Sequence, residues 1–121
     1  MKEKIFIGGD YSGERALFML KDAYLEGVTF HDGESPLKES SNLEIVNCSF
    51  KWKYPIWYAN NVVVKDSFLA KEARSGIWYT DNISMHRCTI DAPKTFRKAS
   101  RITLNSCSLE HADLICLTKS L

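Results

Sequence analysis

The sequence predicts an all-β fold, a right-handed parallel β-helix in which short strands wind into a solenoid. Segments with one apolar pattern recur about every 20 residues, each repeat has room for three short strands, and no segment shows helical periodicity. The chain has 121 residues and a formal net charge of +1, so we expect a single domain over residues 1–121. Residues 1–13 are expected to cap its N-terminal end, and residues 14–121 to form about five to six coils.

The repeat is clearest in LEIVNCSF from Leu43, ISMHRCTI from Ile83 and ITLNSCSL from Ile102. In each segment, apolar residues fall at relative positions 0, 2, 5 and 7. Positions 0 and 2 fit one strand with alternate side chains inward, positions 5 and 7 fit a second strand, and the longer step between them marks a corner. AYLEGVTF from Ala23 follows the same pattern, and VVVKDSF from Val62 follows it one residue short.

A third strand is expected later in each coil, because a further apolar column recurs there. This column contains Leu17, Leu37, Ile56, Ile77, Phe96 and Ile115. A solenoid stacks equivalent positions on one another, so two more inward columns follow from the repeat. They contain Phe30, Phe50, Phe68, Ile90 and Leu109, and Val28, Cys48, Asp66, Cys88 and Cys107. Asp66 interrupts the second column, and we expect the shorter unit to rotate its carboxylate outward.

Polar residues at the start of four units are expected to form a corner ladder, since Asn and Asp tolerate left-handed backbone. These residues are Asp22, Asn42, Asn61 and Asn82. We expect the cysteines to be buried free thiols, because adjacent parallel rungs hold Cβ atoms farther apart than a disulfide prefers. The cysteines are Cys48, Cys88, Cys107 and Cys116. No Cys or His pair has zinc-ligand spacing, so neither a metal nor a cofactor is expected.

Other fold and function classes fit less well. The leucine-rich pattern L-x-x-L-x-L is absent, and the paired Asn-Gly or Asp-Gly turns of a β-sandwich are missing apart from Asp32-Gly33. The balanced charge argues against a nucleic-acid partner. No apolar stretch approaches the about 20 residues of a membrane span, and no secretory signal is visible, so a cytoplasmic location is expected.

Five motifs in order resemble an uncharacterised bacterial family. They are GERALF from Gly13, DGESPLKES from Asp32, WKYPIWY from Trp52, ARSGIWYT from Ala73 and APKTFR from Ala92. The family is known as domain of unknown function 3737, with a pectin-lyase-like right-handed β-helix. The resemblance implies this fold and no established activity or cofactor. It runs from about Asp10 to Ala112; related chains continue for several more coils, so this chain is either a short relative or the N-terminal portion of a longer protein.

The outward column of the third strand is the candidate binding surface. It contains two tryptophans between cations, and with a nearby lysine the candidate ligand-binding residues are Lys38, Lys53, Trp57, Trp78 and Arg97. Sugar rings pack on indole faces, and Arg or Lys pairs with uronate carboxylates. We interpret the protein as a non-catalytic binding or structural module whose stripe contacts a saccharide or a protein partner. The same stripe also fits a ladder that only holds the coils together.

A glycan-active enzyme, either a polysaccharide lyase or a glycoside hydrolase, is the alternative. Two carboxylates about 5–10 Å apart can hydrolyse a glycoside, and a lyase needs a base beside a bound uronate. The candidate catalytic residues are Asp32, Glu34, Glu39, Glu72 and Arg74. No spacing among them is peculiar to an enzyme, so the sequence does not decide whether the protein is one.

The last coil is expected to expose apolar side chains and unpaired backbone groups. Leu109, Ile115 and Leu117 would lie at this open end, and no charged segment follows to cover them. We therefore expect an end-to-end homodimer, or stacking on another chain or further coils.

Overall fold

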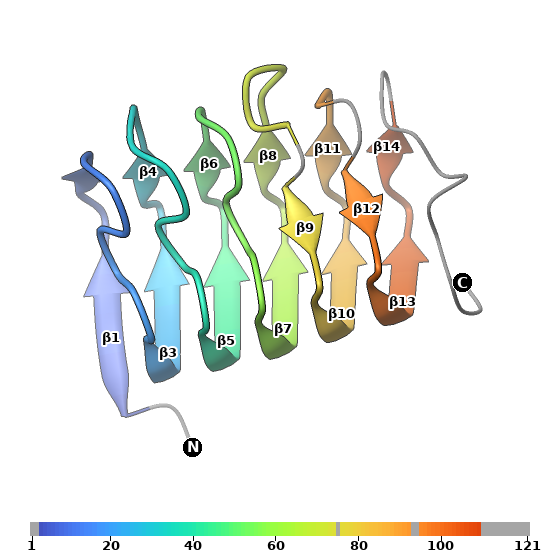
Figure 1. Ribbon diagram of the computed structural model, residues 1–121, viewed down its shortest axis with the longest axis horizontal. Coiled ribbons are helices and arrows are strands. Elements are labelled where there is room, and N and C mark those ends of the chain that lie inside the picture. Colours follow the sequence, from blue (N-terminus) through green and yellow to red (C-terminus); the bar gives the residue numbers. More distant parts are fainter. Residues whose placement is uncertain (1–2, 75, 93–94, 110–121) are drawn as a thin grey trace.

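The computed structural model describes residues 3–74, 76–92 and 95–109, which form a parallel β-helix of about five turns (Figure 1). The all-β prediction is confirmed. The described residues contain strands and turns, and none of them forms a helix long and apolar enough to cross a membrane.

Two six-stranded sheets run along the axis, and every neighbouring pair of strands in them is parallel. The first sheet contains β1 (Lys4–Ile7), β3 (Lys21–Glu26), β5 (Ser41–Val46), β7 (Asn60–Lys65), β10 (Asp81–His86) and β13 (Ser100–Asn105). The second contains β2 (Asp10–Tyr11), β4 (Thr29–Phe30), β6 (Ser49–Phe50), β8 (Phe68–Leu69), β11 (Thr89–Ile90) and β14 (Ser108–Leu109). A two-stranded sheet pairs β9 (Ile77–Trp78) with β12 (Phe96–Arg97). The segment expected to cap the N-terminal end thus contains β1 and β2, the first rungs of the two long sheets.

The strand register places equivalent positions of successive coils side by side. Leu43 pairs with Val62, which pairs with Ile83, and all three side chains are fully buried or nearly so. The intervening outward residues are only partly covered, as the alternation predicts. In the second sheet the Phe30 and Phe50 rings stack with centroids 5.0 Å apart. The core is therefore a set of like-on-like columns.

The corners depend on columns of left-handed backbone. The corner ladder is confirmed: Asp22, Asn42, Asn61 and Asn82 have φ between 54° and 62°. Asn42 donates its amide to Asp22 at 2.6 Å, and Asn82 donates to Asn61 at 2.6 Å. The corner between the two long sheets is left-handed in every coil too, at Gly27, Asn47, Asp66, Arg87 and Ser106.

The coil that starts at Val62 is not one residue short, and this part of the prediction is wrong. Phe50 pairs with Leu69, so Leu69 fills the inward column and Phe68 points outward with 38% of its surface exposed. Ser67 takes the position assigned to Asp66, and its hydroxyl accepts from the Cys48 N–H at 3.1 Å and donates to the Lys65 carbonyl at 2.9 Å. Asp66 does point outward, but because it occupies the left-handed corner, where Arg87 pairs with it at 2.7 Å.

In the described part of the chain, the third side forms the predicted inward column, although only β9 and β12 are strands there. Leu37, Ile56, Ile77 and Phe96 are fully buried, whereas Ile115 lies outside the described residues, as does Leu117 of the expected open end. Backbone bonds still link the coils, for example from the Ile56 N–H to the Gly76 carbonyl at 2.7 Å. Pro36 and Pro55 precede the inward residue in two of the earlier coils and carry no N–H, which prevents a regular ladder.

Cys48 and Cys88 are buried thiols, Cys107 is partly buried, and Cys116 lies outside the described residues. Burial raises the pKa of the Cys88 thiol to about 11 and also raises the pKa of Cys48. Both sulfurs lie near backbone carbonyls; that of Cys88 is 3.5 Å from the Val64 oxygen. These groups are therefore neutral thiols around pH 7.

The corner ladder yields a stability prediction. Asn82→Ala removes the amide bond to Asn61 and places a Cβ-bearing residue without a local hydrogen bond at φ 62°. We expect it to lower the free energy of unfolding by about 1–2 kcal/mol, measured by urea denaturation. Asn82→Gly should lose less, because glycine adopts this φ freely. Ser84→Ala, on the outward face of the same strand, is the control; equal stability of the Ala and Gly variants would contradict the backbone argument.

The thiol column yields a reactivity prediction. In the native protein at pH 8, Cys48 and Cys88 should react with a thiol reagent such as DTNB far more slowly than Cys107, because they are buried and their raised pKa values keep them protonated. In denaturant all should react rapidly. Mass spectrometry of the labelled peptides identifies the order, and native labelling of Cys88 before Cys107 would refute the buried column.

Candidate functional site

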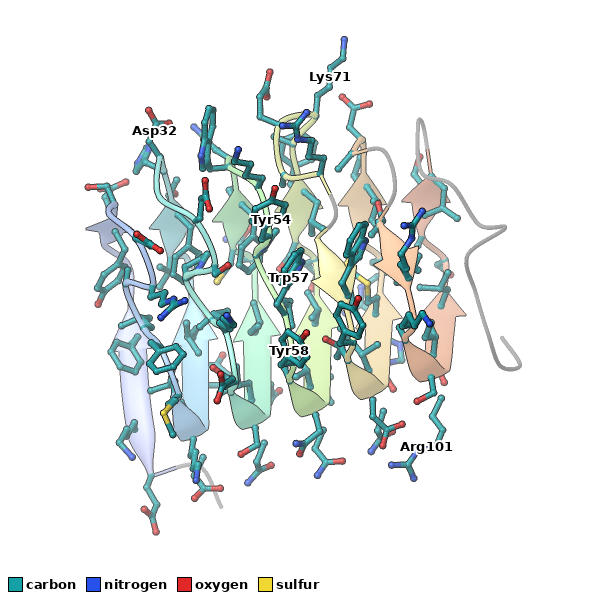
Figure 2. The ribbon with its side chains drawn as sticks, viewed as in Figure 1. Asp32, Tyr54, Trp57, Tyr58, Lys71 and Arg101 are labelled. Atoms are coloured by element: carbon teal, nitrogen blue, oxygen red, sulfur yellow. The ribbon has the colours of Figure 1, made fainter. Side chains whose placement is uncertain are left out.

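Four aromatic residues stack on the third side of the coil, and we call them the aromatic ladder: Trp57, Tyr58, Trp78 and Tyr79. The indoles of Trp57 and Trp78 lie with centroids 5.3 Å apart and planes 5° apart. Tyr58 and Tyr79 stack beside them at 4.7 Å and 4°. Figure 2 shows Trp57 and Tyr58 on the outer surface of the coil, with Tyr54 beside Trp57. The inward neighbours Ile56 and Ile77 fix this direction, because alternate residues point to opposite sides.

The faces of the two indoles are largely occupied by other side chains. Trp78 lies between Trp57 and the Arg97 guanidinium, whose carbon is 4.8 Å from the ring centroid. Trp57 packs against Trp78 and also against Tyr54, with centroids 4.4 Å apart. Ring planes stacked along the helix axis present edges, not faces, to solvent. The ladder therefore links neighbouring coils, and a ligand on this side would meet the ring edges and the tyrosine hydroxyls rather than the indole faces.

The predicted cations do gather around the ladder. The Lys38 ammonium lies 5.7 Å from the Tyr58 centroid, and Arg97 covers Trp78. The Lys53 ammonium lies 5.5 Å from the Tyr54 centroid and 3.4 Å from the Glu34 carboxylate. The structure thus brings all five predicted ligand-binding residues to one side of the coil.

Tyr58 and Tyr79 were not assigned from the sequence. Simple alternation after Ile56 and Ile77 would turn them inward, yet they are 48% and 39% exposed. Their φ values of 54° and 57° place them at a left-handed corner, which redirects their side chains outward. The column to which they belong runs from Met19 through Glu39 to Lys98 and has positive φ throughout. Residues of these types rarely adopt positive φ, so this third corner has no recognisable sequence pattern.

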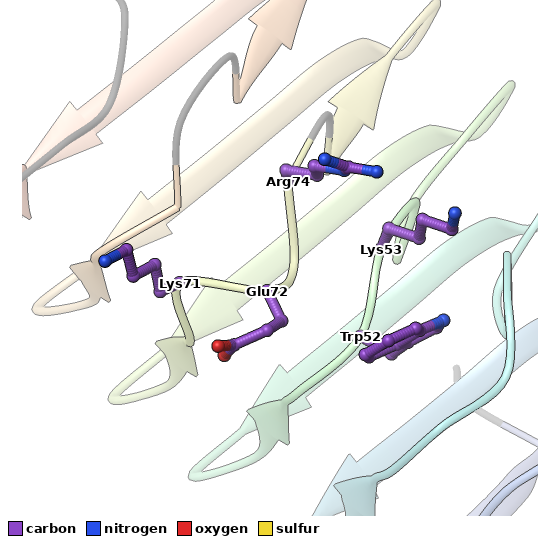
Figure 3. A pocket seen from close by; sticks show the side chains of 5 residues that line it. All are labelled: Trp52, Lys53, Lys71, Glu72 and Arg74. Atoms are coloured by element: carbon purple, nitrogen blue, oxygen red, sulfur yellow. The ribbon is translucent and has the colours of Figure 1, made fainter.

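An open pocket of about 420 Å³ lies next to the ladder (Figure 3). Its lining residues come from the turns that follow β6 and β8: Trp52, Lys53, Lys71, Glu72 and Arg74. In Figure 3, the Lys53 and Arg74 side chains extend toward the same side of the pocket, and the Glu72 carboxylate points away from both. Three cations and one carboxylate give this lining a formal charge of +2 at neutral pH.

The longer turn creates this pocket. Seven residues separate Leu69 from Ile77, whereas five separate Phe50 from Ile56 in the preceding coil. Ala73 is fully buried, and its N–H donates to the Ala70 carbonyl at 2.9 Å, which anchors the turn. The sequence analysis selected Arg74, Glu72 and Lys53 but missed Trp52 and Lys71. The available signal was the extra length of this coil, beside a tryptophan in the preceding turn.

The candidate carboxylates do not form one constellation in the described residues. Glu72 lines the pocket, and Glu34 pairs with Lys53. Asp32 is exposed in the turn after β4, at the tip of the coil in Figure 2, and Glu39 is exposed at the left-handed corner after the third side. Glu72 is the only carboxylate in the lining of this pocket within the described residues. No group of three or more His, Cys, Asp or Glu side chains in the described ranges is placed to hold a metal ion.

Comparison with known proteins adds a family and no activity. The sequence model of a family described as "Protein of unknown function (DUF3737)" matches residues 4–119. Neither the curated proteins nor the solved structures contained a match.

The ladder geometry yields a prediction for Trp78. Trp78→Ala removes the stack on Trp57 and the surface covered by Arg97. An aromatic stack contributes about 0.5–1.5 kcal/mol beyond burial, so we expect the melting temperature to fall by several degrees in a thermal scan followed by circular dichroism. Trp78→Tyr should recover most of the loss because it keeps a ring in the stack. An unchanged melting temperature for the Ala variant would contradict a structural role.

Proposed function

Since the chain belongs to the family of proteins of unknown function DUF3737, which brings no activity with it, we propose that it is a non-catalytic module that binds an acidic saccharide. The observation that carries the proposal is the cationic pocket with a tryptophan in its wall, beside the aromatic ladder. The whole chain has a net charge of only +1, so attraction of an anion depends on this local cluster.

The pocket residues match the groups of a uronate. A carboxylate accepts two parallel hydrogen bonds from an Arg guanidinium, which Arg74 can supply, and Lys71 or Lys53 adds a point charge. The apolar body of the Trp52 indole suits the apolar face of a sugar ring, and its N–H suits a hydroxyl. The volume of about 420 Å³ falls within the range of small-ligand pockets.

The ladder suits an extended ligand. Lys53 joins the pocket to the ladder, because its ammonium lies 5.5 Å from the Tyr54 centroid, and Tyr54 packs on Trp57. From there the ring edges continue through Trp78 to Arg97. A polymer with regularly spaced carboxylates would meet cations at both ends of a hydrogen-bonding aromatic edge. We therefore favour an oligomeric or polymeric uronate over a single anionic sugar.

The arrangement favours binding over hydrolysis. Glycoside hydrolysis uses two carboxylates about 5–10 Å apart, whereas the pocket lining includes one, Glu72. A lyase remains the second candidate, because cations around a uronate site acidify the proton next to its carboxylate. In such a β-elimination, a basic group would take the C5 proton, the electron pair would form the C4–C5 double bond, and the C4 oxygen would leave with a proton.

Binding is tested by calorimetric titration with polygalacturonate and with the same polymer after methyl esterification, which removes its charges. We expect binding to the acid form only. Arg74→Ala and Lys71→Ala should each weaken it about tenfold or more, because a charged hydrogen bond contributes about 1.5–3 kcal/mol. Lys65→Ala changes the net charge equally on β7 of the first long sheet, outside the pocket lining, and should leave the affinity unchanged.

Equal affinity for the esterified polymer, or no effect of Arg74→Ala, would contradict the proposed site. Ultraviolet absorbance of the mixture tests the second candidate, because elimination creates a conjugated double bond. A steady increase in absorbance that is lost in Arg74→Ala would replace the binding module with a lyase. Constant absorbance together with charge-dependent binding supports the module.

A further inference from the structure

The first strand, β1, has an exposed edge that carries two large apolar side chains. Within the described residues, β1 pairs only with β3, and Figure 1 shows it at the end of its sheet. Ile5 and Ile7 are 66% and 65% exposed. The residues beside them in the next coil are Tyr24 and Glu26, whose side chains bond to each other. An edge with unpaired N–H and C=O groups and apolar side chains is a template for pairing with another strand.

Within residues 3–109 as far as they are described, the core is also open at this end. Phe6, Tyr11 and Leu17 pack against the core but are only partly buried. Their equivalents in the second coil, Leu25, Phe30 and Leu37, are at most 2% exposed. The same inward columns therefore continue to the end of the solenoid without a cover among the described residues. Natural solenoids cover such ends, because exposed apolar area of this kind promotes association.

We propose that β1 pairs antiparallel with β1 of a second copy of this chain, about a two-fold axis through Phe6. When two sheets join, outward side chains must meet outward ones, so the pairing can be centred on Ile5 or on Phe6 but not between them. Centring on Ile5 sets Lys4 against Phe6. Centring on Phe6 sets Phe6 against Phe6 and Ile5 against Ile7, so that apolar residues meet on both faces.

The residue opposite Lys4 also allows this register. With Phe6 on the axis, Lys4 of each copy lies opposite Gly8 of the other. Gly8 has no side chain to obstruct Lys4, whose ammonium donates to the Lys21 carbonyl of its own chain at 3.4 Å.

The composition of β13 favours two-fold pairing of β1 over head-to-tail stacking of copies. Among the described residues, the columns of Ile5 and Ile7 reach as far as Thr103 and Asn105, which are both exposed and polar and would meet the isoleucines in a head-to-tail contact. That contact would also repeat without closing and generate a filament. Two-fold pairing of β1 matches apolar with apolar and closes at two copies.

The mass in solution tests this interface. Size exclusion with light scattering at tens of micromolar should give twice the 13.8 kDa chain mass. Ile5→Lys combined with Ile7→Lys should give the monomer, because it sets cations against each other across the axis. Both side chains are exposed, so the variant keeps the core, and circular dichroism checks the fold. Val46→Lys combined with Val63→Lys adds the same charge on the same face away from the edge and should remain dimeric.

Cross-linking tests the register. Ile5→Cys mixed with Ile7→Cys should cross-link through a short bis-maleimide, whereas either variant alone should cross-link much less. A monomeric wild-type protein, or a dimer that survives the double lysine change, would overturn the proposal. Equal cross-linking of Ile5→Cys with itself would also overturn it, since it would place the axis on Ile5.

Discussion

The structure depends on the backbone hydrogen bonds that join each strand to its equivalent one coil away. Parallel pairing fixes the separation of the rungs near 4.8 Å and forbids slippage wherever one face is buried. Each coil must then close in register with the last, and it does so by placing one residue at a left-handed φ at each corner. Asn and Asp meet this requirement at one corner and also bond to each other along the axis, from Asn42 to Asp22 and from Asn82 to Asn61. Register, corner and ladder are thus consequences of one constraint.

The same constraint explains which parts of the fold the sequence could predict. Where inward positions are apolar, as in the coils from Leu43, Ile83 and Ile102, the pattern locates the strands correctly. In the coil from Val62 the inward small position is Ser67, and an apolar residue, Phe68, follows it on the outer face. Counting apolar residues alone shifts that coil by one, because a buried serine with both its hydrogen bonds satisfied looks like a surface residue in sequence. The inward column of the third side was predicted correctly, but the turns in its earlier coils were not. Each proline interrupts strand pairing only in its own coil, so the repeat does not reveal it.

The candidate site likewise has features that the repeat predicts and features that it does not. The outward column of Trp57 and Trp78 follows from periodicity, but the direction of the ring planes does not, because stacking between coils turns the faces along the axis. The outward direction of Tyr58 and Tyr79 was not predicted, because a bulky residue at left-handed φ is uncommon and has no sequence signal. The pocket as a whole was not predicted, because it lies between turns of unequal length, where contacts between coils are not periodic. The repeat therefore makes the scaffold predictable. The residues and turns that depart from the repeat shape the pocket and the surface beside it.

The difference between the repeated ladders and the longer turn indicates where a ligand could bind. Ladders satisfy their own members: Arg87 pairs with Asp66, and Arg101 beside Asp81 lowers the pKa of that carboxyl to about 2, so both ion pairs persist around neutral pH. The indole faces are likewise engaged within the chain. A ligand that competed for these groups would have to break contacts between coils. Lys71 and Arg74 instead lie on the one turn that exceeds its neighbours in length and line the open pocket together with Trp52 of the coil before, so a ligand there would add interactions without removing contacts between coils. Selection for binding can therefore act on this turn while the register of the coils stays fixed.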